Sequence, residues 1–596
     1  MAEQHQSPEP SMSPQELAGL AERTRRVMAE FMQRQAADQA ENPDPLNIAN
    51  AFVQMTQSLV QNPQKLWEMQ AAFWQDYMQL WSSSMRRFWG IESKPVIEPA
   101  PGDRRFKDRD WSENTAFDFI KQSYLLAARY VEQAADSTNG LDEQTKKKID
   151  FYTKQFVDAL APSNFAMTNP EVVRATIDSK GENLVRGLKN LLDDLERGKG
   201  KLHIKMTDYA AFEVGKNIAV SPGKVVYQND LIQLLQYSPT TPSVAKRALL
   251  IVPPWINKFY ILDLRETNSF IKWATSQGQT VFVVSWVNPD EKLAEKTFED
   301  YMQEGMLDAM DAVEKATGER ELNLIGYCLG GTLTAATLAY MASTGDDRVK
   351  SVTFFTTLVD FKEAGDLTVF IDEEQLKTLE ARMAKKGYLE GADMATTFNM
   401  LRANDLIWSF VVNNYLLGKD PFPFDLLYWN SDATRMPQMM HMFYLRKMYQ
   451  ENLLVKPGGI TLKNVPIDLR KVSIPVCILS TKEDHIAPWK ATYAATQLYK
   501  GPVKFILSGS GHIAGVVNPA GSDKYGYWTS SAKKYPKTPD DWLKSATQHK
   551  GSWWPEWRKW LADFEGEQVP ARKPGDGKLK VLEDAPGSYV KVKASD

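Results

Sequence analysis

The sequence has few cysteines, few histidines and no long apolar run, and each shortage excludes a class of protein. Two cysteines in 596 residues, Cys328 and Cys477, cannot form a disulfide framework, and such low usage is typical of a reducing compartment. The six histidines lie scattered without the spacing of a metal site, so we expect neither a metal nor a bound cofactor. Because no run of about 18 apolar residues occurs, we expect no transmembrane helix.

An excess of charge of one sign is also missing. The 71 basic and 75 acidic residues leave a formal net charge of −4, and no basic field indicates a nucleic-acid partner. The opening residues, MAEQHQSPEPSMSPQEL, contain no positively charged start followed by an apolar stretch, so they do not indicate a signal peptide. We therefore expect a cytoplasmic protein.

Residues 1–95 are interpreted as a variable, helical and partly disordered region. Residues 1–13 are rich in Pro, Ser, Gln and Glu and predict a disordered start. Apolar spacing predicts helices over residues 14–35 and 46–60, separated by the sequence NPDP at residues 42–45.

A third helix is predicted over residues 64–90, where large apolar side chains recur every seven residues. These side chains and those at the alternate four-three spacing share one helix face: Trp67, Ala71, Trp74, Met78, Trp81, Met85 and Phe88. The face either packs on the protein's own domain or forms an interface for a partner protein or an apolar surface. The pattern alone leaves these interpretations equally open.

Residues 96–202 begin with a linker and then predict a helical domain, whereas residues 203–570 change to strands. Short, nearly continuous apolar runs alternate there with helix-like sequence, which favours a parallel sheet covered on both faces and hence an α/β fold. The predicted strands are residues 203–207, 225–227, 231–237, 248–252 (ALLIV), 281–285 (VFVVS), 322–325 (LNLI), 352–355 (VTFF), 476–480 (VCILS) and 503–507 (VKFIL).

The alternation fails between about residues 361 and 471, a region rich in Trp, Tyr, Met and Phe. Long insertions in compact domains are commonly lids or binding elements, so we interpret this region as a cap over the active site. An ordinary helical insertion that packs in place is the alternative. Residues 571–596 are polar in composition and are interpreted as a C-terminal tail.

The central motif is GYCLGG at residues 326–331, directly after the predicted strand 322–325 and before a helix-like segment. Strand, sharp turn and helix match the nucleophile elbow G-x-S-x-G of α/β hydrolases, with Cys328 in place of serine. The turn places Cys328 at a helix N-terminus, whose dipole favours a thiolate. Cys477 lies inside a predicted strand, and we expect it to be buried and structural.

An elbow nucleophile predicts an acid and then a histidine, each after a later strand. Asp484 follows the strand VCILS and is the candidate acid, with Glu483 as its nearest rival. His512 lies in the glycine-rich loop after the strand VKFIL and is the candidate base. His485 competes for this role, but its neighbour occupies the acid position, so we interpret His485 as a supporting residue.

The oxyanion hole is expected to use two backbone N–H groups. One belongs to Leu329, directly after the nucleophile, and the other to the loop after strand 248–252, near Trp255 or Ile256. A cysteine nucleophile suits acyl transfer, because one thioester exchanges for another at little energetic cost. This favours thioester substrates such as acyl-CoA over the esters and lactones of a cysteine hydrolase.

Several motifs together resemble the polyhydroxyalkanoate synthases of class I, within the α/β-hydrolase superfamily. The resemblance is carried by GYCLGG, STKEDHIAPW (480–489), SGSGHIAG (508–515), PPWINKFYILDL (253–264), VSWVNPD (284–290) and GSWWP (551–555). Further signatures are RFKD (105–108) with Trp111, PSNF (162–165) and TNP (168–170), so the similarity spans about residues 100–565.

This resemblance implies polymerisation of (R)-3-hydroxyacyl-CoA, with the short-chain 3-hydroxybutyryl-CoA as the expected substrate, into polyester with release of CoA. It assigns Cys328 as the carrier of the acyl chain and His512 as its base. Asp484 either orients His512 or activates the 3-hydroxyl group. It also implies a cytoplasmic homodimer at the surface of polymer granules, where granule-coating proteins are further partners.

Two other functions remain compatible with the same residues. A thioesterase or polyester hydrolase would use the same three side chains, since water and a 3-hydroxyl group compete for one acyl-enzyme. A granule-binding protein without catalysis is the other, although the intact set of Cys328, Asp484 and His512 argues against it.

Overall fold

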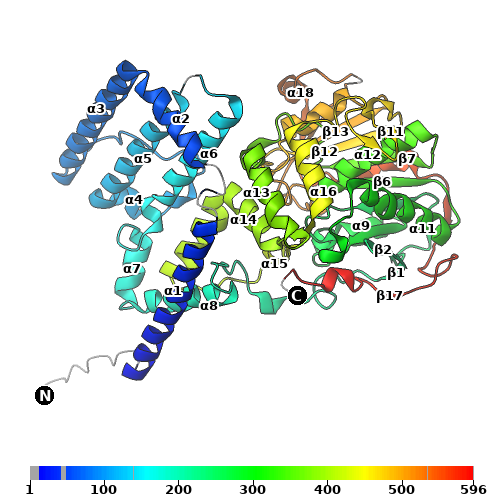
Figure 1. The fold of residues 1–596 in the computed structure, drawn as a ribbon, viewed down its shortest axis with the longest axis horizontal. Coiled ribbons are helices and arrows are strands. Elements are labelled where there is room, and N and C mark those ends of the chain that lie inside the picture. The colour runs from blue at the N-terminus through cyan, green and yellow to red at the C-terminus, as the bar shows by residue number, and fades with distance from the viewer. Residues whose placement is uncertain (1–12, 42–43, 45–47, 139, 533, 595–596) are drawn as a thin grey trace. The chain divides into compact units, whose positions relative to one another are not determined.

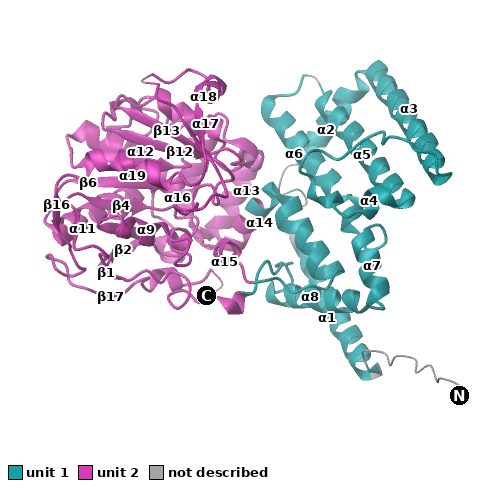
Figure 2. Ribbon diagram, turned by 180° about the vertical axis from the view of Figure 1, so that it is seen from behind, with its two compact units in different colours: residues 1–208, 398–422 teal, residues 209–397, 423–596 magenta. Residues whose placement is uncertain are grey.

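The computed structural model describes residues 13–41, 44, 48–138, 140–532 and 534–594. Nearly all of the expected disordered start at 1–13, and most of the break at 42–45, therefore lie outside the described residues. The chain divides into two compact units, coloured separately in Figure 2. Unit 1 comprises residues 1–208 and 398–422, and unit 2 comprises residues 209–397 and 423–596.

Unit 2 is built on one 11-stranded mixed sheet (Figure 1). The strands in sheet order are β15 (Thr547–His549), β14 (Tyr527–Thr529), β13 (Val503–Ser508), β12 (Val476–Thr481), β7 (Val349–Phe355), β6 (Leu322–Tyr327), β4 (Ala248–Val252), β5 (Val281–Trp286), β2 (Ile232–Tyr237), β1 (Gly223–Gln228) and β17 (Glu583–Asp584). Strands β13 through β5 run parallel, and antiparallel strands extend the sheet on both sides.

The apolar character of the central strands follows from burial on both faces of the sheet. In β4, Leu250 and Val252 belong to one hydrophobic core, while Leu249 and Ile251 belong to the other. Helices α11 (Asp308–Thr317) and α12 (Leu329–Thr344) contribute side chains to the first core. Helices α9 (Phe270–Ser276) and α19 (Trp554–Leu561) contribute to the second. The α/β class predicted from the alternation of strands and helices is confirmed.

Eight of the nine predicted strands are present as strands of this sheet, with bounds that differ by a few residues at most. The prediction of a strand at residues 203–207 is wrong. Side chains of unit 1, and no neighbouring strand, hydrogen-bond the backbone of this segment. The N–H of Lys205 donates to the Asp194 carboxylate, at 2.9 Å, and its carbonyl accepts from the Asn414 side chain, at 2.8 Å. Short apolar runs therefore indicate strands only where a neighbouring strand supplies the hydrogen bonds.

The C-terminal residues behave differently from the expected polar tail. Strand β17 pairs with the edge strand β1, and the hydroxyl of Tyr589 donates to the carbonyl of Asn229 at 2.8 Å. Val590 is 2% exposed. Composition reports the many charged residues of this segment, but it does not report strand pairing or the burial of a single valine.

Unit 1 is helical. Its longer helices are α1 (Pro14–Glu41), α2 (Ile48–Val60), α3 (Pro63–Phe88), α5 (Thr115–Asp136), α6 (Glu143–Ala159), α7 (Pro170–Asp178) and α8 (Glu182–Arg197). Residues 398–422, which lie inside the predicted cap, group with this unit, where η9 (Val411–Leu416) packs on α8. The contact requires glycine at position 187, since a Cβ there would lie 1.8 Å from the Tyr415 carbonyl oxygen. None of the described helices is long and apolar enough to cross a lipid bilayer.

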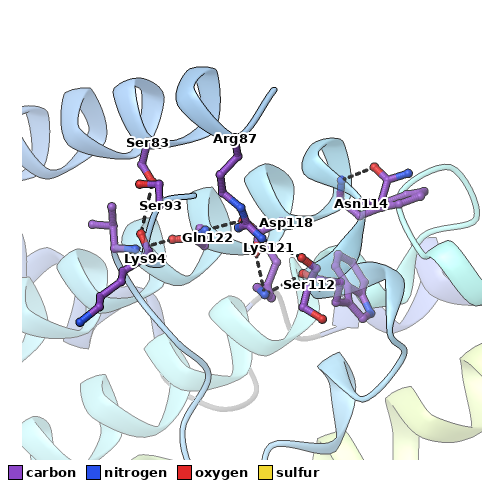
Figure 3. Close-up of polar contacts among 12 residues, drawn as sticks. Ser83, Arg87, Ser93, Lys94, Ser112, Asn114, Asp118, Lys121 and Gln122 are labelled. Carbon is purple, nitrogen blue, oxygen red and sulfur yellow. Dashed lines mark hydrogen bonds and ion pairs between the residues drawn. The ribbon is translucent and has the colours of Figure 1, made fainter. Parts of the chain in front are cut away.

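Helix α3 is attached to α5 through polar contacts, as Figure 3 shows. Arg87 of α3 pairs with Asp118 of α5, which also binds Lys121 at 2.9 Å and the Gln122 amide at 2.6 Å. Asp76 pairs with Arg129 on the same helix pair. The predicted aromatic face is largely exposed, with exposed fractions between 41% and 71% for Trp67, Trp74, Met78, Trp81, Met85 and Phe88. The helix thus directs Asp76 and Arg87 toward α5 and leaves this aromatic face outward.

Candidate active site

Cys328 lies at the sharp turn between β6 and α12. Its φ angle is +51°, which non-glycine residues rarely adopt, and its N–H donates to the Phe355 carbonyl of β7 at 2.9 Å. The thiol is partly exposed at the first turn of the helix. A strained residue at this place presents its side chain above the carboxyl edge of the sheet, as a nucleophile elbow requires.

The glycines around Cys328 are required by close approach of neighbouring atoms. A Cβ on Gly326 would lie 2.6 Å from the Cα of Gly331. A Cβ on Gly330 would lie 2.2 Å from the Val252 carbonyl oxygen at the end of β4. Any larger residue at either position would push the turn away from the sheet, and the Cys328 thiol with it.

The structure brings His512 and Asp484 together, although 28 residues separate them in sequence. His512 follows β13 and Asp484 follows β12, so adjacent parallel strands deliver both side chains to the same edge of the sheet. The Nδ1 atom of His512 lies 2.7 Å from Oδ2 of Asp484. The side chain of Cys328 also acts electrostatically on the ring, so the three predicted residues form one connected group.

The carboxylate of Asp484 is buried and fully engaged. Its Oδ1 accepts the backbone N–H groups of Ile486, at 2.9 Å, and Ala487, at 2.8 Å. Its Oδ2 accepts the hydroxyl of Thr481, at 3.0 Å, in addition to the His512 ring. A carboxylate offers about four acceptor positions, so these contacts use its capacity and fix its orientation.

The protonation of His512 is set by opposing effects. Burial alone would lower its pKa, because an imidazolium loses hydration. The negative charges of Asp484 and Cys328, together with their hydrogen bonds, outweigh burial and raise the pKa of His512 to about 10. The arrangement therefore stabilises an imidazolium at His512, beside the side chain of Cys328.

Cys477 contrasts with Cys328. It lies in β12 with no exposed surface, and burial raises the pKa of its thiol to about 12. It remains a neutral, packed side chain at physiological pH, so the prediction of a buried cysteine is confirmed.

The other described histidines lie apart from this group. Burial lowers the pKa of His441 to about 4, which keeps its ring neutral, and His549 bonds the hydroxyl of Thr529 at 2.8 Å. His485 directly follows Asp484, but the carboxylate of that residue is directed to His512. Within the described parts of the chain, no three His, Cys, Asp or Glu side chains are grouped as metal ligands.

Three tyrosines near the group were not anticipated from the sequence. The hydroxyl of Tyr327 donates to the carbonyl of His512 at 3.3 Å. Tyr444 and Tyr449 contact each other edge to face and both interact with Cys328, while burial is the main cause that raises the pKa of each phenol. Both lie on the π-helix η10 (Tyr444–Gln450), a type of helix common at functional sites. Tyrosine residues among many other aromatics carry no sequence signal that marks them.

The two backbone N–H groups predicted for an oxyanion hole belong to segments that border the elbow. Leu329 is the first residue of α12, so its N–H has no acceptor within the helix. Ile256 lies in the loop after β4, and the end of that strand contacts the elbow at Gly330. Acyl transfer through a covalent intermediate requires a nucleophile, a base and backbone donors of this kind.

Comparisons with known proteins agree with this geometry. The family described as "Poly-beta-hydroxybutyrate polymerase (PhaC) N-terminus" matches residues 102–274, and the family described as "alpha/beta hydrolase fold" matches residues 255–519. The "Poly(3-hydroxyalkanoate) polymerase" of Methylorubrum extorquens is 53% identical over 548 residues, which cover 92% of this chain and 90% of the relative.

Two further relatives carry the name "Poly(3-hydroxyalkanoate) polymerase subunit PhaC". The protein of Rhizobium meliloti (strain 1021) is 51% identical and covers 89% of this chain and 87% of its own length. The protein of Cupriavidus necator is 43% identical, with 89% of both chains covered. The chain therefore belongs to the family of poly(3-hydroxyalkanoate) polymerases, enzymes that in this case are built on the α/β-hydrolase fold.

Proposed function

We propose that this enzyme polymerises (R)-3-hydroxyacyl-CoA, and in particular short-chain substrates such as 3-hydroxybutyryl-CoA, through a thioester on Cys328. The observation that carries the proposal is the connected group of Cys328, His512 and Asp484 at the elbow. The CoA thioester is the substrate and free CoA the product, so the proposed reaction uses no separate cofactor.

In the first step the Cys328 thiolate attacks the carbonyl carbon of the CoA thioester. The oxyanion that forms is stabilised by the N–H groups of Leu329 and Ile256. The bond between the carbonyl carbon and the CoA sulfur then breaks, and CoA leaves with the proton held on the Nε2 atom of His512. Cys328 keeps the acyl group as a thioester.

In the second step the 3-hydroxyl group of another acyl unit attacks this thioester. His512, now neutral, takes the hydroxyl proton through Nε2, and the Cys328 thiolate leaves. One ester bond forms for each CoA released. A single base thus serves both steps, because it is charged when CoA departs and neutral when the alcohol arrives.

We assign Asp484 to orienting His512, and its four hydrogen bonds support this choice over activation of the 3-hydroxyl group. Replacing Asp484 by Asn would turn the His512 ring to the wrong tautomer, which in related triads lowers kcat about 10⁴-fold. For Asp484→Asn we therefore expect CoA release to fall by about this factor while substrate binding stays unchanged.

The hydrolase alternative uses the same acyl-enzyme and differs only in the attacking group. Buried aromatic side chains near Cys328, among them Trp255, Phe361 and Tyr444, favour an alcohol on an apolar chain over water. The names of the relatives point the same way.

We further propose that the enzyme works as a cytoplasmic homodimer at the surface of polyester granules, in contact with granule-coating proteins. The exposed aromatic face of α3 supports attachment to a granule, because a polyester offers apolar surface and carbonyl acceptors. Indole N–H groups at Trp67, Trp74 and Trp81 are donors that suit such carbonyls.

The test is CoA release from (R)-3-hydroxybutyryl-CoA, with the product examined for insoluble polyester, for the native chain and for Cys328→Ala. Polymer and CoA from the native chain, with both lost in the variant, is the expected result. Release of free 3-hydroxybutyrate alone would favour the hydrolase. Activity that survives in Cys328→Ala would refute the proposed mechanism.

A further inference from the structure

The loop at residues 253–258 borders the elbow and is fixed at its beginning. The Pro253 carbonyl oxygen would lie 2.5 Å from a Cβ on Gly330, so the loop begins directly against the first turn of α12. The same carbonyl accepts the indole N–H of Trp286 at 2.8 Å. The position of Ile256, three residues later, depends on what holds the rest of the loop.

The second half of the loop is held by residues 429–435. This segment begins in the last turn of α15 (Asp425–Ser431) and continues beyond the helix. The hydroxyl of Thr434 lies 3.0 Å from the Trp255 carbonyl and 2.6 Å from the Ile256 carbonyl. In a trans peptide the carbonyl and the following N–H point in opposite directions. Because the Trp255 carbonyl is turned toward Thr434, the Ile256 N–H is turned away from residues 429–435.

A buried ion pair closes this arrangement. The ammonium group of Lys258 lies 2.7 Å from Oδ1 of Asp432, and the two side chains are 4% and 8% exposed. The other oxygen of Asp432 accepts the hydroxyl of Tyr260 at 2.8 Å, and the Lys258 carbonyl accepts the indole N–H of Trp429 at 2.7 Å. Charges so well shielded from water can persist only with their partners in place.

The C-terminal segment adds two hydrogen bonds to this arrangement. Lys258 also donates to the Val592 carbonyl at 2.9 Å, and the guanidinium group of Arg435 donates to the Ala594 carbonyl at 2.6 Å. Residues 592–594 therefore contact both the loop, through Lys258, and residues 429–435, through Arg435.

We propose that Lys258 and Asp432 form a latch that positions the Ile256 N–H for the oxyanion, with residues 592–594 as its third member. Neither residue touches the reacting atoms, so both are positioning residues. Release of residues 429–435 would break the ion pair and turn the peptide that carries the donor. This inference rests on the proposed function for the reaction that the donor serves.

The test compares two reactions of Cys328 in Lys258→Met and Asp432→Asn. Single-turnover CoA release requires an oxyanion donor, whereas alkylation by iodoacetamide forms no oxyanion. We expect CoA release to fall about 100-fold, the usual effect of losing one donor, and alkylation to change less than about twofold. KM should change little, because the donor acts in the transition state.

The double variant Lys258→Met/Asp432→Leu guards against a failure to fold, since an apolar pair commonly replaces a buried ion pair without loss of stability. It should match the native unfolding temperature and still release CoA slowly. A chain ended at Lys591 should show the same selective defect. Recovery of native CoA release in the folded double variant would show that the ion pair only stabilises the fold, and would overturn the latch.

Arg247→Met is the matched control. Arg247 pairs with Glu321 at 2.6 Å, but both precede their strands and thus lie at the opposite edge of the sheet from Cys328. CoA release in this variant should equal that of the native chain. If alkylation falls together with CoA release in the latch variants, the thiol itself is displaced and the latch is refuted. If the native chain releases no CoA, the proposed function fails first and the latch fails with it.

Discussion

His512 lies between two groups that are negative when ionised, and this makes its charge a structural matter as well as a catalytic one. In an unfolded chain a histidine titrates near pH 6.5, whereas Asp484 and Cys328 raise the pKa of His512 to about 10 in the folded protein. Folding therefore binds a proton between these two pH values, and stability depends on pH there.

The stability that protonated His512 contributes is complete below about pH 6.5, decreases as the pH rises from there, and is lost above about pH 10. Glutamine cannot gain a proton, so His512→Gln lacks this contribution. We expect the difference in unfolding temperature between the native chain and His512→Gln to shrink steadily from pH 6.5 to pH 10. A difference that stays constant over this range would contradict the proposed imidazolium.

The sequence predicted Cys328, Asp484 and His512 because each follows a strand in the order that an elbow dictates. The partners of these residues could not be predicted in the same way. Lys258 and Asp432 are 174 residues apart, and nothing in their local sequence marks either as buried or paired. Contacts of this kind arise from the packing of distant segments, which spacing along one segment cannot report.

At the scale of elements, the elbow depends on how closely α12 approaches the end of β4. A methyl group on residue 330 would lie 2.2 Å from the carbonyl oxygen of Val252, a backbone atom that cannot move without the sheet. Gly330→Ala should therefore destabilise unit 2 by about 3 kcal/mol, the upper end for overpacking, and should lower CoA release as well. Thermal unfolding and single-turnover kinetics measure the two effects.

Gly19→Ala provides the control, because Gly19 lies in α1 and no atom lies within 4 Å of the added Cβ. Alanine favours a helix over glycine by about 1 kcal/mol, so this variant should be as stable as the native chain or more so. If both variants behaved alike, the close approach of α12 to β4 would carry no energetic weight.

Helix α3 carries an exposed apolar stripe in addition to the apolar face that it buries. Between residues 69 and 85 its one charged residue is Asp76, which pairs with Arg129 and accepts the hydroxyl of Tyr130 at 2.8 Å. The stripe of Trp, Met and Phe side chains is exposed to water, and exposed apolar area of this kind is unfavourable in free energy. The sequence pattern could not separate packing from an interface; the exposed fractions favour the interface.

Exchange of Trp67, Trp74 and Trp81 for Gln should weaken adsorption to poly(3-hydroxybutyrate) particles about tenfold or more, since each indole removes apolar contact area. Cosedimentation with particles measures this, in a Cys328→Ala background so that no new polymer forms. Phe156→Gln/Phe165→Gln, two exposed aromatics elsewhere in unit 1, should leave adsorption unchanged. Unchanged adsorption of the Trp variant with loss of the dimer would identify the stripe as a self-association surface instead.

Strand prediction succeeded where burial on both faces produced continuous apolar runs, as in β4, β6 and β12. It failed where an apolar pattern lacked a neighbouring strand, at residues 203–207. Residues 398–422 show the same limit, because their grouping with unit 1 depends on contacts such as that of Tyr415 with Gly187. Local pattern reports what a segment can form, and distant partners decide what it does form.

At the scale of the whole molecule, the C-terminal segment connects the far edge of the sheet with the loop at residues 253–258. Residues 583 and 584 extend the sheet beside β1, Ser588 and Glu583 bond the amide of Gln233 on β2, and Val592 reaches Lys258. A stretch whose composition predicted a solvated tail is thus part of the structure of unit 2.

Ending the chain at Pro570 should therefore lower the unfolding temperature of unit 2 by several degrees, because the truncation exposes the edge of β1 and removes the buried Val590. CoA release should also fall, by more than the loss of folded protein explains, since the contact of Lys258 with Val592 is lost as well. Lys578→Ala/Lys580→Ala removes charge but keeps the backbone, and because both side chains are exposed it should change the free energy of unfolding by less than about 0.5 kcal/mol. A truncated chain that unfolds and turns over like the native one would show that these contacts carry no weight, and would return the segment to the role of a tail.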